Sequence, residues 1–149
     1  IIYLHVISIF GFLLSHGVSV QVAYALKRER DTEKIRSLLA LSRAPYTLMI
    51  SSLLAIIIFG VIAGFMGQWW GSLWIWISII LLVIIFSLMF YLGTNVFGAA
   101  RNAAEKASDP TGTNQELLTI LDKNNPTLLM IIGFGGFAII TLLMMFKPF

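Results

Sequence analysis

Four apolar runs of membrane-spanning length take up most of the 149-residue chain. They lie at about residues 1–26, 45–67, 73–100 and 126–146. Each run holds about 20 or more residues without a carboxylate or ammonium group, and a helix of that length crosses roughly 30 Å of hydrocarbon. The sequence therefore predicts one all-α membrane domain over residues 1–149, with four transmembrane helices in an antiparallel bundle.

Composition supports this class and limits the chemistry. Hydrophobic residues make up 58% of the chain and charged residues 11%, whereas roughly a quarter of the residues of a soluble domain are charged. The two longer connections are too short to hold a separate catalytic domain. Cysteine is absent, which excludes disulfides, thiolate ligation of copper or iron–sulfur clusters and covalent c-type haem attachment, but leaves ligation by imidazole open.

Nine of the ten Lys and Arg residues lie in two connections between spans. The first connection carries Lys27, Arg28, Arg30, Lys34, Arg36 and Arg43, and the second carries Arg101, Lys106 and Lys123. By the positive-inside rule both connections are expected in the cytoplasm and both termini outside. The net charge of +3 expresses this topology, so we expect no nucleic-acid partner.

Aromatic residues mark the expected membrane surfaces. Trp69, Trp70, Trp74 and Trp76 crowd the short turn between the second and third spans, and Tyr24 and Tyr46 flank the basic connection. Such belts are typical of membrane–water interfaces.

Both basic connections have apolar residues at helical spacing, which predicts short amphipathic helices. The first has Ile35, Leu38 and Leu39, and the second has Leu117, Leu118 and Leu121. In the second connection a turn at 109–112 is followed by a capping box of Thr113 and Glu116. Helices of this kind rest on lipid headgroups, and docking of a partner subunit is the alternative role.

Two sequence signals mark helix starts inside the apolar runs, and glycines mark close packing. Pro45 suits a first helical turn, and Asn125 followed by Pro126 reads as a cap at the fourth span. Gly60 and Gly64 form a GxxxG pattern, and Gly133, Gly135 and Gly136 cluster in the fourth span. We expect these glycines to let helices within the chain approach closely, with homodimerisation as the alternative.

The first span carries both histidines of the chain, His5 and His16, eleven residues apart. On a helix this spacing puts the two within about 20° of one azimuth and roughly 16 Å apart along the axis. The same face carries Ser8, Phe12, Ser15, Ser19 and Ala23. This small and polar face is predicted to point into the bundle, with His16 near mid-membrane and His5 near the outer surface.

The separation means that one planar cofactor cannot contact both histidines. Each would need a second ligand from another helix, and the chain has no third histidine, so a methionine, a water or an open position would complete the site. The alternative is structural, in which a buried neutral imidazole makes hydrogen bonds with a residue such as Ser15 or Ser19.

The ends of the chain resemble a known family. Leu4-His5-Val6 with Gly11, the basic run after the first span, and the closing Met144-Met145-Phe146-Lys147-Pro148 are similar to an uncharacterised family of four-span bacterial integral membrane proteins. More distantly, the Leu-His start resembles copper-resistance D-type membrane proteins and HemJ-type protoporphyrinogen oxidases, in which a first-helix histidine binds haem. The resemblance implies the bacterial cytoplasmic membrane as the location and His5 as a haem-iron ligand. The copper motifs of those proteins are missing.

Three functional interpretations remain open. The first is an accessory subunit of a larger membrane complex of redox or electron-transfer type, with haem b bound through His5 or His16. The second is a purely structural subunit, and the third is a stand-alone haem-dependent oxidoreductase or a small-molecule or metal carrier. The sequence has no carboxylate pair, metal triad or nucleotide loop, so it offers no catalytic residues. We predict the lipid bilayer, other membrane subunits or further copies of the chain as partners.

Overall fold

The computed structural model describes residues 1–106 and 115–148. This part of the chain consists of helices joined by short turns and contains no strand. The predicted all-α class is confirmed. The turn at 109–112 and Thr113 of the expected capping box lie outside the described residues.

Four helical stretches are long and apolar enough to cross a membrane, namely Ile2–Arg28, Thr32–Met66, Leu73–Lys106 and Pro126–Phe146. Their elements are α1 (Ile2–Arg28), α2 (Thr32–Leu41), α3 (Ala44–Met66), the 3-10 turn η1 (Trp69–Gly71), α4 (Leu73–Gly93), the π-helical η2 (Thr94–Gly98), α5 (Ala99–Lys106), α6 (Gln115–Lys123), α7 (Pro126–Met130), the π-helical η3 (Ile131–Gly135) and α8 (Gly136–Phe146). Length and composition thus define a multi-pass membrane protein.

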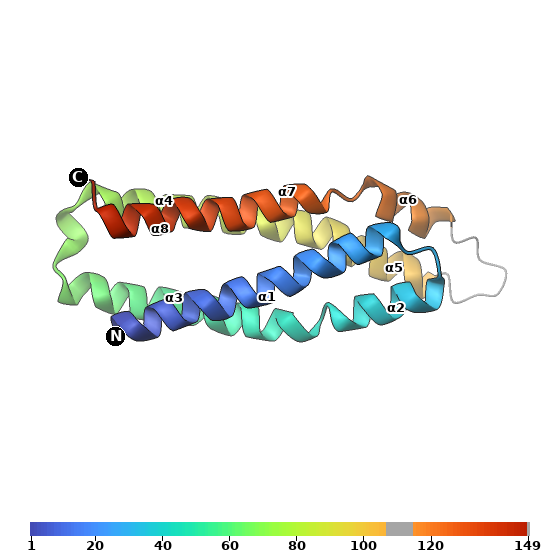
Figure 1. The fold of residues 1–149 in the computed structure, drawn as a ribbon, viewed down its shortest axis with the longest axis horizontal. Helices are drawn as coiled ribbons and strands as arrows, with labels where there is room; N and C mark the ends of the chain where they lie inside the picture. The colour runs from blue at the N-terminus through green and yellow to red at the C-terminus, as the bar shows by residue number, and fades with distance from the viewer. Residues whose placement is uncertain (107–114, 149) are drawn as a thin grey trace.

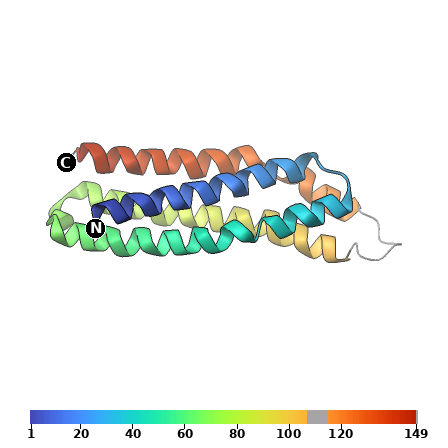
Figure 2. The ribbon, with the colours of Figure 1, turned by 60° about the horizontal axis from the view of Figure 1, so that its bottom comes forward.

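The long stretches lie side by side, with both termini and η1 at one end and α2, α5 and α6 toward the other (Figure 1). We call these the turn end and the basic end. α1 packs along α3, and α4 packs along α8. Figure 2 shows the same arrangement from another side. The molecule is therefore two helix pairs laid against each other.

Helix starts follow the local signals in the sequence. The side chain of Asn125 accepts a hydrogen bond from the backbone N–H of Leu128, and Pro126 lies in the first turn of α7. Pro45 lies in the first turn of α3. Both predicted starts are confirmed. Proline suits these positions because it has no N–H that would be left unpaired in the first helical turn.

Helical structure goes on beyond the apolar runs at the basic end. Ser42 and Arg43, between α2 and α3, keep right-handed helical backbone angles, and α2 nearly continues the line of α3 (Figure 1). In the same way α4, η2 and α5 form one path to Lys106. Lys and Arg favour helices, so Arg43 and Arg101 do not interrupt these two helical paths, whereas α1 ends at Arg28.

The apolar faces of the connecting helices pack on the protein. Together with α1 and α5 they form one cluster, the basic-end core, made of Val22, Leu26, Ile35, Leu39, Ala100, Ala103, Ala104, Leu117 and Leu121. Leu26, Ile35 and Leu121 are fully buried. Ile35, Leu39, Leu117 and Leu121 thus fill an interior within the protein, and the expected position of these helices at the lipid headgroups stays a prediction.

Candidate functional site

His5 lies between α1 and α3. Its Nδ1 donates to the backbone carbonyl oxygen of Ile56 over 2.9 Å, which leaves Nε2 as the atom with the free electron pair. A Cβ built on Gly60 would lie 3.0 Å from Cε1 of His5. Gly60 therefore serves close packing within the chain, as the sequence predicted for this glycine.

His16 lies deeper, between α1 and η3, and its side chain is almost fully buried, at 3% exposure. The rings of Phe12 and Phe134 flank it, with centroids 6.4 and 5.0 Å away. Its Nε2 is buried and has no hydrogen-bond partner among the described residues. A Cβ on Gly133 would collide with that nitrogen, so only glycine leaves room for the imidazole here.

The predicted polar face of α1 does point inward. Its buried members are Ser8, Phe12, Ser15, His16 and Ala23, while His5 and Ser19 are half-buried. The suggested bond between His16 and a serine is wrong, however. Ser15 donates to the carbonyl of Gly11 over 2.9 Å and Ser19 to that of Ser15 over 3.1 Å, because a helical serine finds its nearest acceptor one turn back.

The two histidines differ in how well they could hold a haem iron. Nε2 of His16 faces the backbone at Gly133, so His16 in this position has no space for an iron and does not fit. His5 has the orienting bond to a backbone carbonyl that metal-ligating histidines use. Among residues 1–106 and 115–148, no group of three His, Cys, Asp or Glu side chains could hold a metal ion.

An interior cavity of about 500 Å³ lies between the two helix pairs and borders His16. Its lining draws on α1, α3, α4, η2, α5 and the fourth stretch, and includes Phe12, Met49, Leu53, Leu82, Phe86, Met89, Phe97 and Phe137. Both π-helical segments contribute, through Thr94 and Gly98 of η2 and Gly133 of η3. Such segments are frequent at functional sites.

The basic end of this cavity carries a cation. Nη2 of Arg101 donates to Oγ of Ser42 over 2.7 Å, and Nε of Arg101 is buried without a hydrogen-bond partner among the described residues. Ser42 also donates to the carbonyl of Leu39 over 2.7 Å. Sequence reasoning treated Arg101 as a topological charge and missed this role. Its position at the end of a very apolar run was the available signal.

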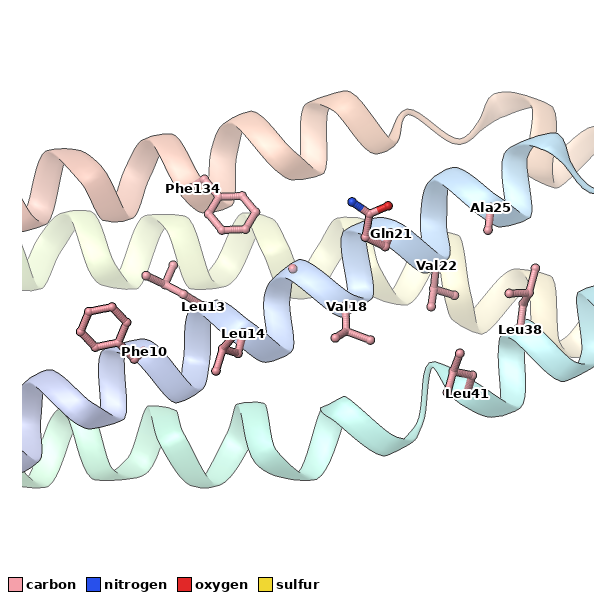
Figure 3. A pocket seen from close by; sticks show the side chains of 11 residues that line it. Phe10, Leu13, Leu14, Val18, Gln21, Val22, Ala25, Leu38, Leu41 and Phe134 are labelled. Atoms are coloured by element: carbon pink, nitrogen blue, oxygen red, sulfur yellow. The ribbon is translucent and has the colours of Figure 1, made fainter.

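A second, shallow groove of about 790 Å³ runs along the outward face of α1. Figure 3 shows its lining, which is Phe10, Leu13, Leu14, Gly17, Val18, Gln21, Val22, Ala25, Leu38, Leu41 and Phe134. Gln21 is exposed and is the one amide among these apolar residues. No hydrogen bond holds its side chain within the part of the chain that the structure describes.

The turn end gathers the tryptophans. Nζ of Lys147 lies 4.0 Å from the ring centroid of Trp69 and 5.7 Å from that of Trp74. The indole of Trp76 donates to the carbonyl of Trp70 over 3.0 Å. This aromatic cluster suits an interface between membrane and water.

Comparison with known proteins gives no match: no protein family, curated protein or solved structure is similar to this chain. The family resemblance noted from the end motifs thus stays a prediction.

Proposed function

We propose that the chain is an accessory subunit of a larger membrane assembly in the bacterial cytoplasmic membrane. Its four spans form an antiparallel bundle with both termini outside, and the amphipathic helices of the connections lie on the cytoplasmic side. The asymmetry of Lys and Arg between the two ends supports this orientation. The resemblance to haem-binding membrane proteins favours redox assemblies.

Gln21 is the observation that carries this proposal. It precedes Lys27 by six residues, which sets its amide about 9 Å along α1 from the charged boundary and therefore within the hydrocarbon. An amide without partners in an apolar medium is costly, at roughly 2–7 kcal/mol. A helix of another subunit that offers an amide or a hydroxyl group would remove this cost.

The shape of the groove around Gln21 suits a helix. Gly17 and Ala25 lie one turn before and one turn after Gln21 on α1. Small side chains at this spacing let two backbones come close enough for a hydrogen bond between helices. Leu14, Val18 and Leu41 line the groove as well and would contact the partner's apolar side chains.

The test removes the amide and compares complexes extracted in a mild detergent. Gln21→Leu should release the chain from its partner in native mass analysis, since it replaces the amide with an apolar side chain of similar length. Ser87→Leu is the matched control, because Ser87 is exposed on α4 and bonds only within its own helix.

Two results would contradict the proposal. One is a wild-type chain that runs as a lone monomer, and the other is a Gln21→Leu variant that keeps its partner. A Gln21→Cys variant identifies the occupant, because the chain has no other cysteine. A disulfide-linked homodimer would show that a second copy, not another subunit, fills the groove.

Haem b at His5 is the second candidate function. The bond from Nδ1 to the Ile56 carbonyl supports it, since this bond fixes the tautomer that leaves Nε2 free for iron. The purified protein should then show a haem absorption band that His5→Ala removes and His16→Ala keeps. A colourless preparation that retains its native partners would end this candidate.

A further inference from the structure

The interior cavity extends from the headgroup region into the hydrocarbon. Arg101 follows Leu73, the first residue of α4, by 28 residues, or about 42 Å along the helix path. A bilayer with its headgroup regions is about 40–45 Å thick. If α4 begins at one surface, Arg101 lies among the headgroups of the opposite leaflet, and Phe86 lies inside the hydrocarbon.

The inner part of the cavity is apolar and adaptable. Leu53, Leu82, Phe86 and Phe137 form its walls, and Met49 and Met89 line it too. Methionine side chains adjust to irregular apolar ligands. The volume of about 500 Å³ falls in the range of about 300–1,000 Å³ for small-molecule sites. This part suits a flexible hydrocarbon chain.

α3 and α4 line the cavity from two sides. These two helices are joined through η1 but do not pack along their length. Tyr46 and Phe90, which line the cavity from the two sides, are 53% and 62% exposed. A molecule dissolved in the bilayer could enter here without crossing water.

The end of the cavity at Arg101 and Ser42, which we call the mouth, carries positive charge without a counterion among the described residues. In the guanidinium of Arg101, Nη2 donates to Oγ of Ser42, and the buried Nε has no hydrogen-bond partner among the described residues. Arg43 is close enough to interact with this guanidinium electrostatically. The ion pairs of the described chain involve other residues, and Glu105, one turn further along α5, is not paired with Arg101. The mouth therefore offers charge-assisted donors to an anion.

From this geometry we infer that the cavity binds an anionic amphiphile, with its carboxylate or phosphate on Arg101 and one acyl chain between the helix pairs toward His16. Two sources share this chemistry, a free fatty acid and an anionic phospholipid. The inference does not depend on the proposed subunit role, because Gln21 lies on the opposite, outward face of α1 and lines a different groove.

The experiment measures lipid retention by the full chain in detergent, using native mass spectrometry. The probes are sodium palmitate, phosphatidylglycerol and phosphatidylcholine, the two phospholipids having the same acyl chains. Palmitate or phosphatidylglycerol should stay bound at concentrations where phosphatidylcholine does not. Retention of both anionic probes indicates a general anion site, and retention of one of them identifies the source.

Variants locate the site. Arg101→Gln should weaken retention of the anionic probe by about tenfold or more, the typical effect of losing a charge-assisted hydrogen bond. Ser42 keeps its bond to Leu39 in that variant. Arg28→Gln is the matched control, because it removes the same charge from the same end at an exposed position, and it should retain the probe as the wild type does.

A cavity-filling variant keeps the inference falsifiable if Arg101→Gln fails to fold. Leu82→Trp should reduce retention of the anionic probe while the charge at the mouth is unchanged. The inference is overturned if phosphatidylcholine binds as well as the anionic probes, or if folded Arg101→Gln and Leu82→Trp proteins both retain the anionic probe like the wild type.

Discussion

The basic-end core and the interior cavity differ in how completely they are packed, although both are built from apolar side chains. In the basic-end core Leu26, Ile35, Ala100 and Leu121 have no exposed surface. The cavity between the helix pairs, which shares only α1 and α5 with that core, has a volume of about 500 Å³. Apolar composition alone therefore does not determine packing in this molecule.

The proposed membrane placement would explain the difference. If α2 and α6 lie outside the hydrocarbon, water drives their apolar faces onto Leu26 and the alanines of α5. Within hydrocarbon that force is absent, because lipid tails are as apolar as leucine, and helices associate through shape and hydrogen bonds. A cavity inside the spans then costs little if lipid can fill it.

The largest expected effect concerns orientation. The basic end and the turn end should face different compartments, so that labelling of each end is all-or-none. Ser37→Cys on α2 should react with an impermeant maleimide only after the membrane is permeabilised, whereas Ser72→Cys beside η1 should react in intact cells. The chain has no cysteine of its own, so the cysteine-free wild type is the control. The reverse pattern would overturn the orientation.

Shortening a side chain to alanine should lower the free energy of unfolding more in the basic-end core than in the wall of the cavity. Leu121→Ala removes a fully buried side chain and should lower the free energy of unfolding by about 2–5 kcal/mol. Leu82→Ala enlarges a space that already exists, so its cost should be clearly smaller. Thermal unfolding in detergent, followed by circular dichroism, compares the two, and equal losses would refute the contrast.

Within the spans, packing at His16 is expected to be tight on one side. Gly133→Ala places a methyl group against Nε2 of His16 and should cost about 1–3 kcal/mol of stability. Combining it with His16→Ala should restore part of this loss, while Gly135→Ala meets nothing within 4 Å and serves as control. Strictly additive losses would mean that the two residues do not touch.

The smallest expected effect lies at the turn end. Lys147→Ala removes the cation that lies 4.0 Å from the Trp69 ring centroid and should cost about 0.5–1 kcal/mol if the site is exposed. Tryptophan fluorescence should shift at the same time, because the environment of Trp69 changes. Lys147→Arg should keep both properties. An unchanged spectrum in the Lys147→Ala variant would argue against the contact.

Helix class, helix starts and the inward face of α1 could be predicted because each depends on local pattern. The eleven-residue spacing of His5 and His16 fixes a common face on any helix, and Asn125 caps α7 through its own backbone neighbourhood. The wrong expectation concerned a hydrogen-bond partner, because the serines near His16 bond their own helix. The cluster that joins Ile35 and Leu121 was also missed, because it depends on contacts between distant helices.

The cavity and its cation could not be predicted in this way. They depend on the separation of α3 from α4 and on two π-helical segments, and neither feature has a local signal in the sequence. In the sequence Arg101 is one of ten basic residues. Only the path of α4 through η2 brings it to Ser42, 59 positions earlier in the chain.

The π-helical η2 makes the chain sensitive to length at one place. A π turn holds about one residue more than an α turn, so deleting a single residue within Thr94–Gly98 would let the stretch relax into regular α-helix. Such a relaxation leaves the position of α4 in the membrane unchanged, because η2 follows α4 in the chain. A deletion elsewhere in the same stretch, where no extra residue is stored, would instead rotate Arg101 by about 100° around the helix axis and away from Ser42. Natural variation in length should therefore be tolerated best at η2 and η3.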